Sequence, residues 1–229
     1  MACQNFEVRL PPAAVADQYS EVFILERAGQ VEQVAVHDYE TIYPITGLYE
    51  RLIVEALQCV SHEMIPDLLA QVVSRSGTRM ADLHVLDFGA GSGLVGAALA
   101  RHGVNTIVGL DIVPEARSAA RRDHADVYQA YIIGDICQLE PADQAILSRL
   151  QPNCLISVSA IGLGAHISPH ILTCAINVMP RGSWIAFNLN ASFLEKESPT
   201  GYANVLEQLT SRSQLTLHLR HTYQHRILT

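Results

Sequence analysis

The sequence predicts an α/β fold in which a doubly wound, mostly parallel sheet follows an N-terminal helical extension. From residue 83 onward, short apolar runs alternate with stretches of helical spacing, and this alternation is typical of parallel βαβ units. A glycine-rich segment at residues 89–93 follows the first apolar run, where sheets of this type bind ligands. Residues 1–80 read as mostly helical. We therefore expect 1–80 to be an extension or lid of the same domain and 81–229 to be the ligand-binding core.

Each predicted element follows from its local pattern. Apolar runs predict strands at Leu83–Phe88, Thr106–Leu110, Val127–Ile133, Cys154–Ser159, Trp184–Leu189 and Leu215–Arg220. The stretches between them predict helices at Leu94–His102, Pro114–Asp123, Pro141–Leu150, Pro169–Val178 and Tyr202–Ser211. In the extension we expect helices at Asp17–Glu26, at Leu48–Val60 and from Ser61 through Ser74, with Ser61 as the cap of the last one.

Charge and cysteine content narrow the classes of partner. The formal net charge is −8, with 15 Lys and Arg against 23 Asp and Glu, whereas a protein that binds nucleic acid usually carries a basic face. We therefore expect neither nucleic acid nor an anionic membrane as a partner. The five cysteines form no CxxC pair, which favours reduced thiols in the cytoplasm and no metal site. We also expect no leader peptide and no membrane span. The sequence leaves open whether the protein forms a homo-oligomer.

The glycine-rich segment is the sharpest feature of the chain. Glycines allow a tight turn and let a ligand lie against the backbone, and the helix that follows offers free N–H groups. Gly91, Gly93 and Gly96 fit the G-x-G-x-x-G pattern of dinucleotide-binding folds. Asp87, two residues before the first glycine, would however repel a pyrophosphate. It suits the cationic amino acid end of S-adenosylmethionine, which carries no phosphate, so we favour that cofactor.

Two further acids follow the next two predicted strands. Asp111 lies at the end of the second strand, where a carboxylate accepts hydrogen bonds from both ribose hydroxyls. It would serve NAD equally well, and its alternative role is to cap the helix at Pro114–Asp123. Asp135, after the third strand, can accept the exocyclic amine of adenine while Ile136 packs on the ring. An Asp in that position is also a common cap or turn residue.

These residues resemble the class I S-adenosylmethionine-dependent methyltransferases, which have a Rossmann-like fold. Residues 87–93 look like the first motif of that family, and residues 134–136 like its adenine motif. Residues 153–160 look like the fourth strand, whose end faces the methyl group, and residues 179–184 like the turn before the fifth strand. The resemblance covers residues 83–190. It implies cofactor contacts from Tyr39, Tyr43, Asp87, Gly89, Ala90, Gly91, Gly93, Asp111, Ile112, Asp135, Ile136 and Ser159.

The N-terminal tyrosines carry a weaker resemblance to the small methyltransferases akin to the Williams–Beuren region methyltransferase. Tyr39, Tyr43 and Tyr49 alternate with polar residues, and this pattern predicts a mobile lid at Val36–Tyr49 over the methionine end of the cofactor. The alternative is an amphipathic helix packed permanently on the sheet. The chain departs from the family at the sheet edge. There, Thr216–Thr229 supplies a compressed seventh strand or the edge is incomplete.

The resemblance places the methyl acceptor against the N-terminal segment and the loops after the fourth and fifth strands. His166 is a candidate general base for a hydroxyl acceptor, with a surface histidine as the alternative. Asn188, Asn190 and Phe193 are candidates to line the acceptor pocket. The chain lacks the Asn/Asp-Pro-Pro-Tyr/Phe motif that clamps amino groups of bases and amides, so we expect a small-molecule acceptor. A nicotinamide-dependent oxidoreductase and a non-catalytic S-adenosylmethionine-binding module remain the alternatives.

Overall fold

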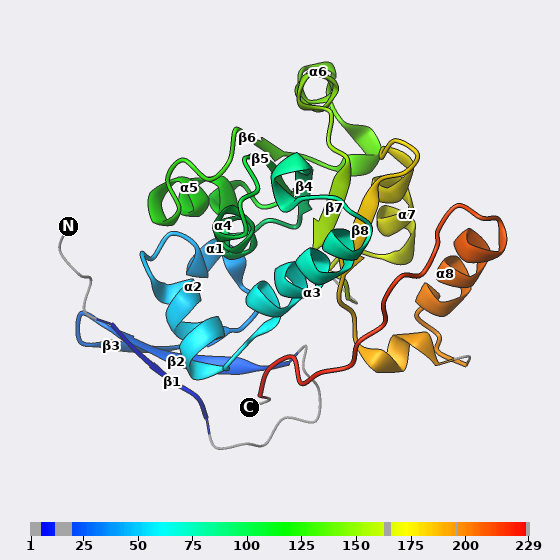
Figure 1. The fold of residues 1–229 in the computed structure, drawn as a ribbon. Coiled ribbons are helices and arrows are strands. Elements are labelled where there is room, and N and C mark those ends of the chain that lie inside the picture. Colours follow the sequence, from blue (N-terminus) through cyan, green and yellow to red (C-terminus); the bar gives the residue numbers. More distant parts are fainter. Residues whose placement is uncertain (1–5, 12–19, 163–165, 196, 228–229) are drawn as a thin grey trace.

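A five-stranded parallel sheet forms the centre of the computed structural model, which describes residues 6–11, 20–162, 166–195 and 197–227 (Figure 1). The strands are β4 (His84–Phe88), β5 (Thr106–Asp111), β6 (Ala130–Ile133), β7 (Cys154–Ser157) and β8 (Trp184–Phe187). They pair in the order β6-β5-β4-β7-β8, and every neighbouring pair is parallel. Because the order runs outward from β4 in both directions, the predicted doubly wound sheet is confirmed.

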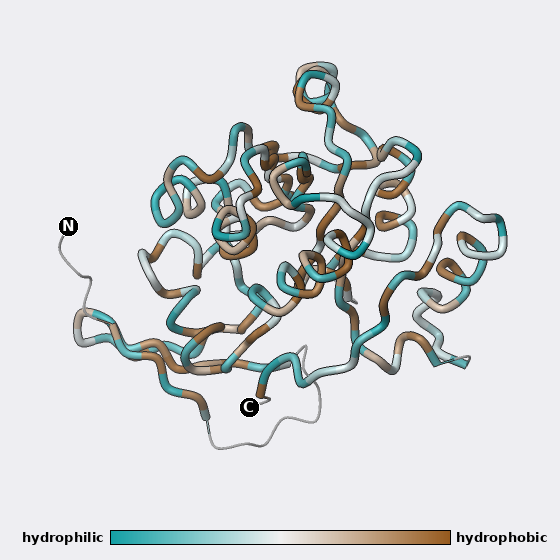
Figure 2. Tube along the Cα trace, viewed as in Figure 1, coloured by the Kyte–Doolittle hydropathy of each residue, from teal (hydrophilic) through white to brown (hydrophobic). Residues whose placement is uncertain are grey.

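Helices cover both faces of the sheet. The helices α3 (Ser61–Arg75), α4 (Leu94–Arg101) and α5 (Pro114–Asp123) lie on one face, and α6 (Pro141–Leu150), α7 (Pro169–Asn177) and α8 (Tyr202–Ser211) on the other. Side chains of β4 alternate between the two cores, since Val85 packs toward α3 and α4 while Leu86 packs toward α7. The strands therefore read as continuous apolar runs (Figure 2). No helix in the described part of the chain is long and apolar enough to cross a membrane.

The N-terminal extension is part strand and part helix, which corrects the prediction of a mostly helical segment. An antiparallel sheet forms from β1 (Phe6–Arg9), β2 (Val22–Arg27) and β3 (Gln30–Ala35). The predicted helix at Asp17–Glu26 is wrong over residues 22–26, and residues 17–19 lie outside the described ones. Phe23 and Leu25 are buried while their neighbours are more exposed, and this period of two is that of a strand. The short helices α1 (Tyr39–Ile42) and α2 (Leu48–Glu50) follow, and the π-helix η1 (Arg51–Ala56) continues α2.

The C-terminal segment differs most from the prediction. Residues 215–227 carry no secondary structure, so the predicted strand at Leu215–Arg220 is wrong and the seventh strand is not formed in the described residues. The segment instead returns to the start of α3, where the Val60 N–H donates to the His225 carbonyl (3.1 Å) and the Ile227 N–H donates to the Leu57 carbonyl (2.9 Å). Consequently β8 is an edge strand.

The predicted cap of α3 is also corrected. The N-cap residue is Val60, without a side-chain cap bond. The Ser61 hydroxyl lies 2.7 Å from the Tyr223 hydroxyl and 2.6 Å from His225 Nδ1. Ser61 thus ties the C-terminal segment to α3 instead of closing the first helical turn.

Candidate functional site

The candidate site lies at the carboxyl ends of β4 and β7, where the strand order reverses and open α/β sheets bind ligands. The loops that follow these two strands touch here. A Cβ on Gly89 would lie 2.5 Å from the Cβ of Ala160, and Gly89 has a φ of +75°. Glycine is therefore required at residue 89 for both space and backbone conformation. The predicted glycine loop thus lies in the crevice between β4 and β7.

Asp111 fixes this loop against the end of β5. Its Oδ2 accepts the Gly91 N–H at 2.8 Å, and its Oδ1 accepts the Val113 N–H at 2.9 Å. Burial raises the pKa of Asp111, and the N–H groups of Val113 and Gly91 counteract that rise. The N-cap of α5 is Val113, without a side-chain cap bond, so the alternative role of Asp111 as the helix cap is not observed. The carboxylate instead holds the turn after β4 and the turn after β5 together.

Tyr131 and Tyr128, which sequence reasoning missed, support the same loop from β6 and its preceding turn. The Tyr131 hydroxyl donates to the Gly91 carbonyl at 2.7 Å. The Tyr128 hydroxyl lies 2.5 Å from the place a Cβ on Gly96 would take. The third glycine of the G-x-G-x-x-G pattern therefore makes room for Tyr128. Packing within the protein therefore explains why residue 96 is a glycine, and a bound dinucleotide is not needed to explain it.

Asp87 is fully buried beneath the loop. Its Oδ2 accepts the Tyr128 hydroxyl at 2.8 Å, whereas its Oδ1 is buried without a hydrogen bond among the described residues. Burial raises the pKa of Asp87 to about 7, against the lowering effect of Tyr128. The structure thus places Asp87 below the loop, where a nearby cation would stabilise its charged form.

The raised pKa of Asp87 predicts a pH-dependent stability. The folded protein binds this proton more tightly than the unfolded chain, whose carboxyl has a pKa near 3.8. The contribution of Asp87 to the free energy of unfolding should therefore fall as the pH rises from about 4 to about 7, by about 1.4 kcal/mol for each unit of pKa difference. The lowered pKa values of His37 and His225 act in the opposite direction, so a comparison of variants isolates the contribution of Asp87. Urea denaturation across this pH range measures the effect. The free energy of unfolding of the unaltered chain minus that of Asp87→Asn should fall as the pH rises, whereas the same difference for exposed Asp126→Asn, the control, should not. A difference for Asp87→Asn that does not change with pH would contradict the prediction.

The three N-terminal tyrosines pack together in the cluster that contains Ala90 of the glycine loop. Tyr39 stacks on Tyr43 at 5.4 Å between ring centroids, and Tyr43 contacts Tyr49 at 5.2 Å. The Tyr43 hydroxyl lies 2.7 Å from the place a Cβ on Gly91 would occupy. Burial and the nearby Asp111 raise the pKa of Tyr39 to about 12. Tyr43 thus reaches the loop, Tyr39 stacks on Tyr43, and burial keeps both hydroxyls neutral by raising their pKa values.

The remaining residues predicted to contact the cofactor differ in how much of each side chain is exposed and in the structural role of each residue. Ile112 is 67% exposed beside Asp111, so an apolar surface is available there. Ile136 is buried in the core against α7, a position that leaves little of it to face a ligand. Asp135 accepts the Cys137 N–H at 2.9 Å as the cap of η3 (Ile136–Gln138). Gly93, with a φ of +98°, is the N-cap of α4.

The residues predicted for the acceptor side lie on and near the loop after β7. Ser159 has a φ of +59°, an uncommon conformation for a residue other than glycine and one that gathers at functional sites. Its N–H donates to Asn188 Oδ1 at 2.8 Å. The His166 ring lies 4.9 Å from the ring of His37, which comes from the N-terminal extension. Burial, followed by His166, lowers the pKa of His37 to about 4, so His37 is neutral at physiological pH.

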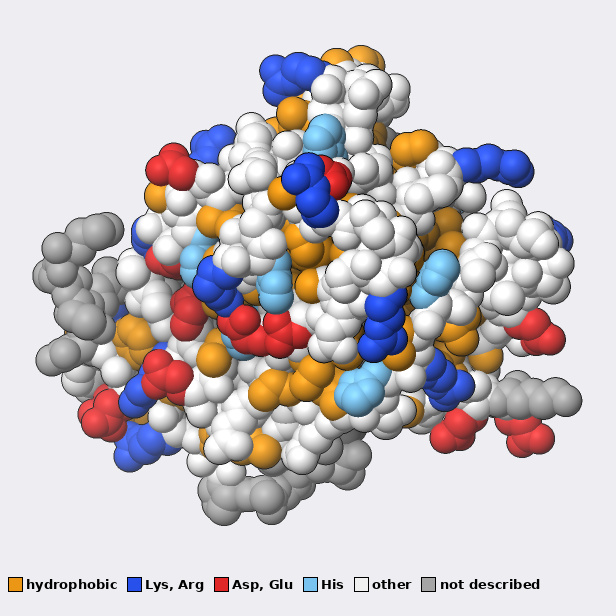
Figure 3. All heavy atoms as spheres, viewed as in Figure 1, with side chains coloured by type: hydrophobic (Ala, Val, Ile, Leu, Met, Phe, Trp, Pro, Cys, Tyr) orange, Lys and Arg blue, Asp and Glu red, His pale blue; other side chains and the backbone are white. Residues whose placement is uncertain are grey.

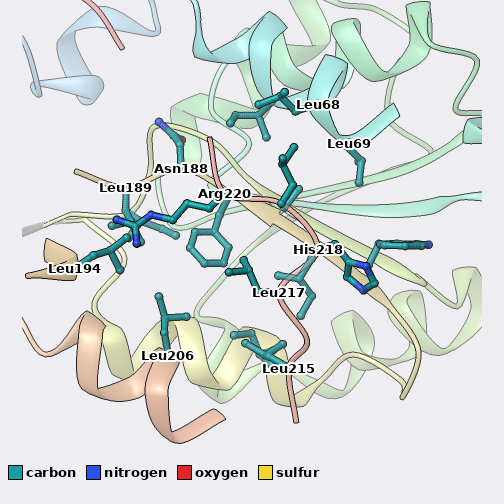
Figure 4. A pocket seen from close by; sticks show the side chains of 18 of the residues that line it. Leu68, Leu69, Asn188, Leu189, Leu194, Leu206, Leu215, Leu217, His218 and Arg220 are labelled. Carbon is teal, nitrogen blue, oxygen red and sulfur yellow. The ribbon is translucent and has the colours of Figure 1, made fainter. Parts of the chain in front are cut away.

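A cleft of about 1600 Å³ extends from these groups along β8. Leucines form much of its wall, and the Asn188 and Arg220 side chains lie among them (Figure 4). Asn190 lies on the wall and caps η4 (Ala191–Leu194), and Phe193 stacks on Tyr202 at 5.3 Å. Sequence reasoning missed His37 and the C-terminal residues of this cleft, because they approach the site only through long-range packing.

The chain matches the family model of a methyltransferase domain over residues 85–156. A TehB-like SAM-dependent methyltransferase from Corynebacterium glutamicum is 15% identical with a TM-score of 0.48, over 71% of this chain and 78% of that chain. Magnesium protoporphyrin IX methyltransferase from Synechocystis PCC 6803 with bound SAM is 14% identical with a TM-score of 0.48, over 72% and 76%. Similarities as low as these do not indicate which reaction the chain catalyses. No curated protein matches the chain.

Proposed function

We propose that this chain is a class I S-adenosylmethionine-dependent methyltransferase that transfers a methyl group to a small-molecule acceptor. The match of residues 85–156 to the model of a methyltransferase domain supports this proposal. The main support for S-adenosylmethionine as the cofactor is the glycine loop, which Asp111 at the end of the neighbouring strand holds in place. When bound, S-adenosylmethionine supplies a methyl group on a sulfonium, and the protein supplies position and exclusion of water.

The residues present fit such a cofactor. A carboxylate accepts more hydrogen bonds than the two that Asp111 takes from the backbone, so it can also receive the ribose hydroxyls. Ile112 offers exposed apolar surface beside it, and Asp135 is the candidate partner of the adenine amine. The buried Oδ1 of Asp87 suits a cationic ligand end nearby. We assign cofactor positioning to these groups and to Gly89, Ala90, Gly91 and Gly93.

The N-terminal segment is proposed to cover the methionine end of the cofactor. The Tyr43 hydroxyl reaches Gly91, and Tyr39 packs against the cluster that contains Tyr43 and Ala90. Ile42, Ile45 and Leu48 anchor the segment in the core of the antiparallel sheet. A tyrosine hydroxyl in this position can donate to the ligand carboxylate, and the covering segment excludes water.

Hydrogen exchange tests whether this cover moves as a lid. We expect amides of Val36–Tyr49 to become more protected when S-adenosylhomocysteine binds, with α6 as the internal control. Protection that is already high without ligand and does not rise would contradict a mobile lid. It would favour the alternative of a segment packed permanently on the sheet, which the burial of Ile42, Ile45 and Leu48 also favours.

The acceptor is proposed to enter the cleft beside His166. The leucine-lined wall and the polar end at Ser159 and Asn188 suit a small molecule with an apolar body and a polar reacting group. On the face shown in Figure 3, basic side chains are scattered among acidic ones, which supports a small molecule over a polyanion. His166 is the candidate to accept the proton of a hydroxyl acceptor, and neutral His37 can receive a hydrogen bond beside it.

Calorimetric titration with S-adenosylhomocysteine and with NADH tests the cofactor, and a screen of hydroxyl and amine acceptors tests the reaction. We expect S-adenosylhomocysteine to bind and NADH not to bind. Tight NADH binding without S-adenosylhomocysteine binding would establish the oxidoreductase alternative. Cofactor binding with no methyl transfer to any acceptor would support the non-catalytic module.

A further inference from the structure

Three side chains that commonly bind metals lie together on the face of the sheet covered by α7. Cys137 belongs to η3, and His170 and Cys174 belong to α7. One ligand atom from each residue lies within 4.8 Å of the other two. The methyl-transfer site uses none of these side chains, so the cluster calls for a separate explanation.

The backbone holds the three residues in a chelating arrangement. His170 and Cys174 are four residues apart on one helix, so their side chains share a face. Cys174 Sγ lies 3.8 Å from His170 Nε2. Bonds of about 2.0–2.3 Å around a tetrahedral cation would separate two such ligands by about 3.6 Å. Residue Ile136 of η3 and Leu172 of α7 share one buried core, which fixes the position of Cys137 relative to the helix.

We propose that Cys137, His170 and Cys174 form a binding site for a thiophilic divalent cation such as Zn²⁺. Two sulfur atoms and an imidazole are soft ligands that favour Zn²⁺ or Co²⁺ over Mg²⁺ or Ca²⁺. Three protein ligands leave the fourth tetrahedral position to water, and His170 is exposed, so a hydrated cation can reach the site. Both thiols lose their protons to solvent on binding.

The site would also couple metal binding to cofactor binding, a consequence that rests on the proposed function, in which Asp135 binds adenine. Asp135 accepts the Cys137 N–H, so a cation on Cys137 joins α7 to the residue after β6. No metal-ligand set is evident in the sequence, because the cysteines form no CxxC pair and the ten histidines are spread along the chain. Here the ligands come from two elements that meet only in the folded chain.

Titration of the full, reduced and metal-free chain with Co²⁺ tests this site without reference to methyl transfer. We expect one equivalent to bind with a sulfur-to-cobalt charge-transfer band, and Zn²⁺ to displace it. His170→Asn and Cys174→Ser should each weaken binding at least as much as loss of a supporting residue does, about 10–100-fold. Because His170 is exposed, His170→Asn should fold normally, and circular dichroism checks this.

Cys59→Ser is the matched control. Cys59 Sγ and His225 Nδ1 form another thiol–imidazole pair, at 3.7 Å, and this variant should bind Co²⁺ as the unaltered chain does. A missing charge-transfer band, or a band that His170→Asn and Cys174→Ser leave unchanged, would overturn the site. A mild oxidant that joins Cys137 to Cys174 in a chain that binds no Co²⁺ would also overturn it, and would show a redox pair instead.

Discussion

Gly91→Val is expected to abolish S-adenosylhomocysteine binding while the central sheet stays folded. Gly91 has a φ of +54°, and its Cβ would lie 2.7 Å from the Tyr43 hydroxyl. A branched side chain would push the tyrosine away or distort the loop, and the left-handed backbone alone costs it about 1–2 kcal/mol. Either response moves the N–H that Asp111 accepts, so the surface offered to the ligand is lost.

Isothermal titration calorimetry measures this loss, and circular dichroism with urea denaturation checks the fold. Gly103→Val is the matched control, because Gly103 also has a positive φ, +88°, but no heavy atom lies within 4 Å of its Cβ position. That variant should be destabilised and still bind. Retained binding in folded Gly91→Val would show that the loop is an ordinary turn.

Asp111→Ala should weaken S-adenosylhomocysteine binding by about 1.5–3 kcal/mol, the scale of hydrogen bonds to a charged group. This corresponds to about 10- to 150-fold in Kd. The carboxylate is expected to receive the ribose hydroxyls, and it also accepts the N–H groups of Gly91 and Val113. Its removal therefore loses ligand contacts and loosens the loop together.

Asp111→Asn separates these two effects, because an amide oxygen keeps one acceptor for the backbone. We expect this variant to lie between the unaltered chain and Asp111→Ala. Asp67→Ala, on an exposed side chain of α3, controls for the loss of a carboxylate elsewhere. Unchanged affinity in a folded Asp111→Ala variant would remove Asp111 from the binding site.

Local sequence patterns were sufficient to predict the α/β core. The helices α5, α6 and α8 have the predicted bounds, and two of them begin with a proline, which is favourable in the first turn. The glycine loop and Asp111 were also recognisable, because the ends of neighbouring parallel strands meet at one edge of a sheet. These features depend on residues close in sequence or on the regular geometry of βαβ units.

Contacts between distant segments decided the rest. The strand β2 was mistaken for a helix because its burial depends on pairing with β1 and β3. The C-terminal segment does not pair with β8. Strand pairing could not be predicted there, because an apolar run forms a strand only where another strand lies beside it in the folded chain. Tyr128 beneath the glycine loop and His37 beside His166 likewise come from other parts of the chain. The sequence by itself determined the α/β core and the glycine loop, since periodicity and strand ends are local properties. Only the tertiary structure decided the raised pKa of Asp87, the cleft along β8 and the cysteine–histidine cluster, because burial and proximity arise when remote segments pack together.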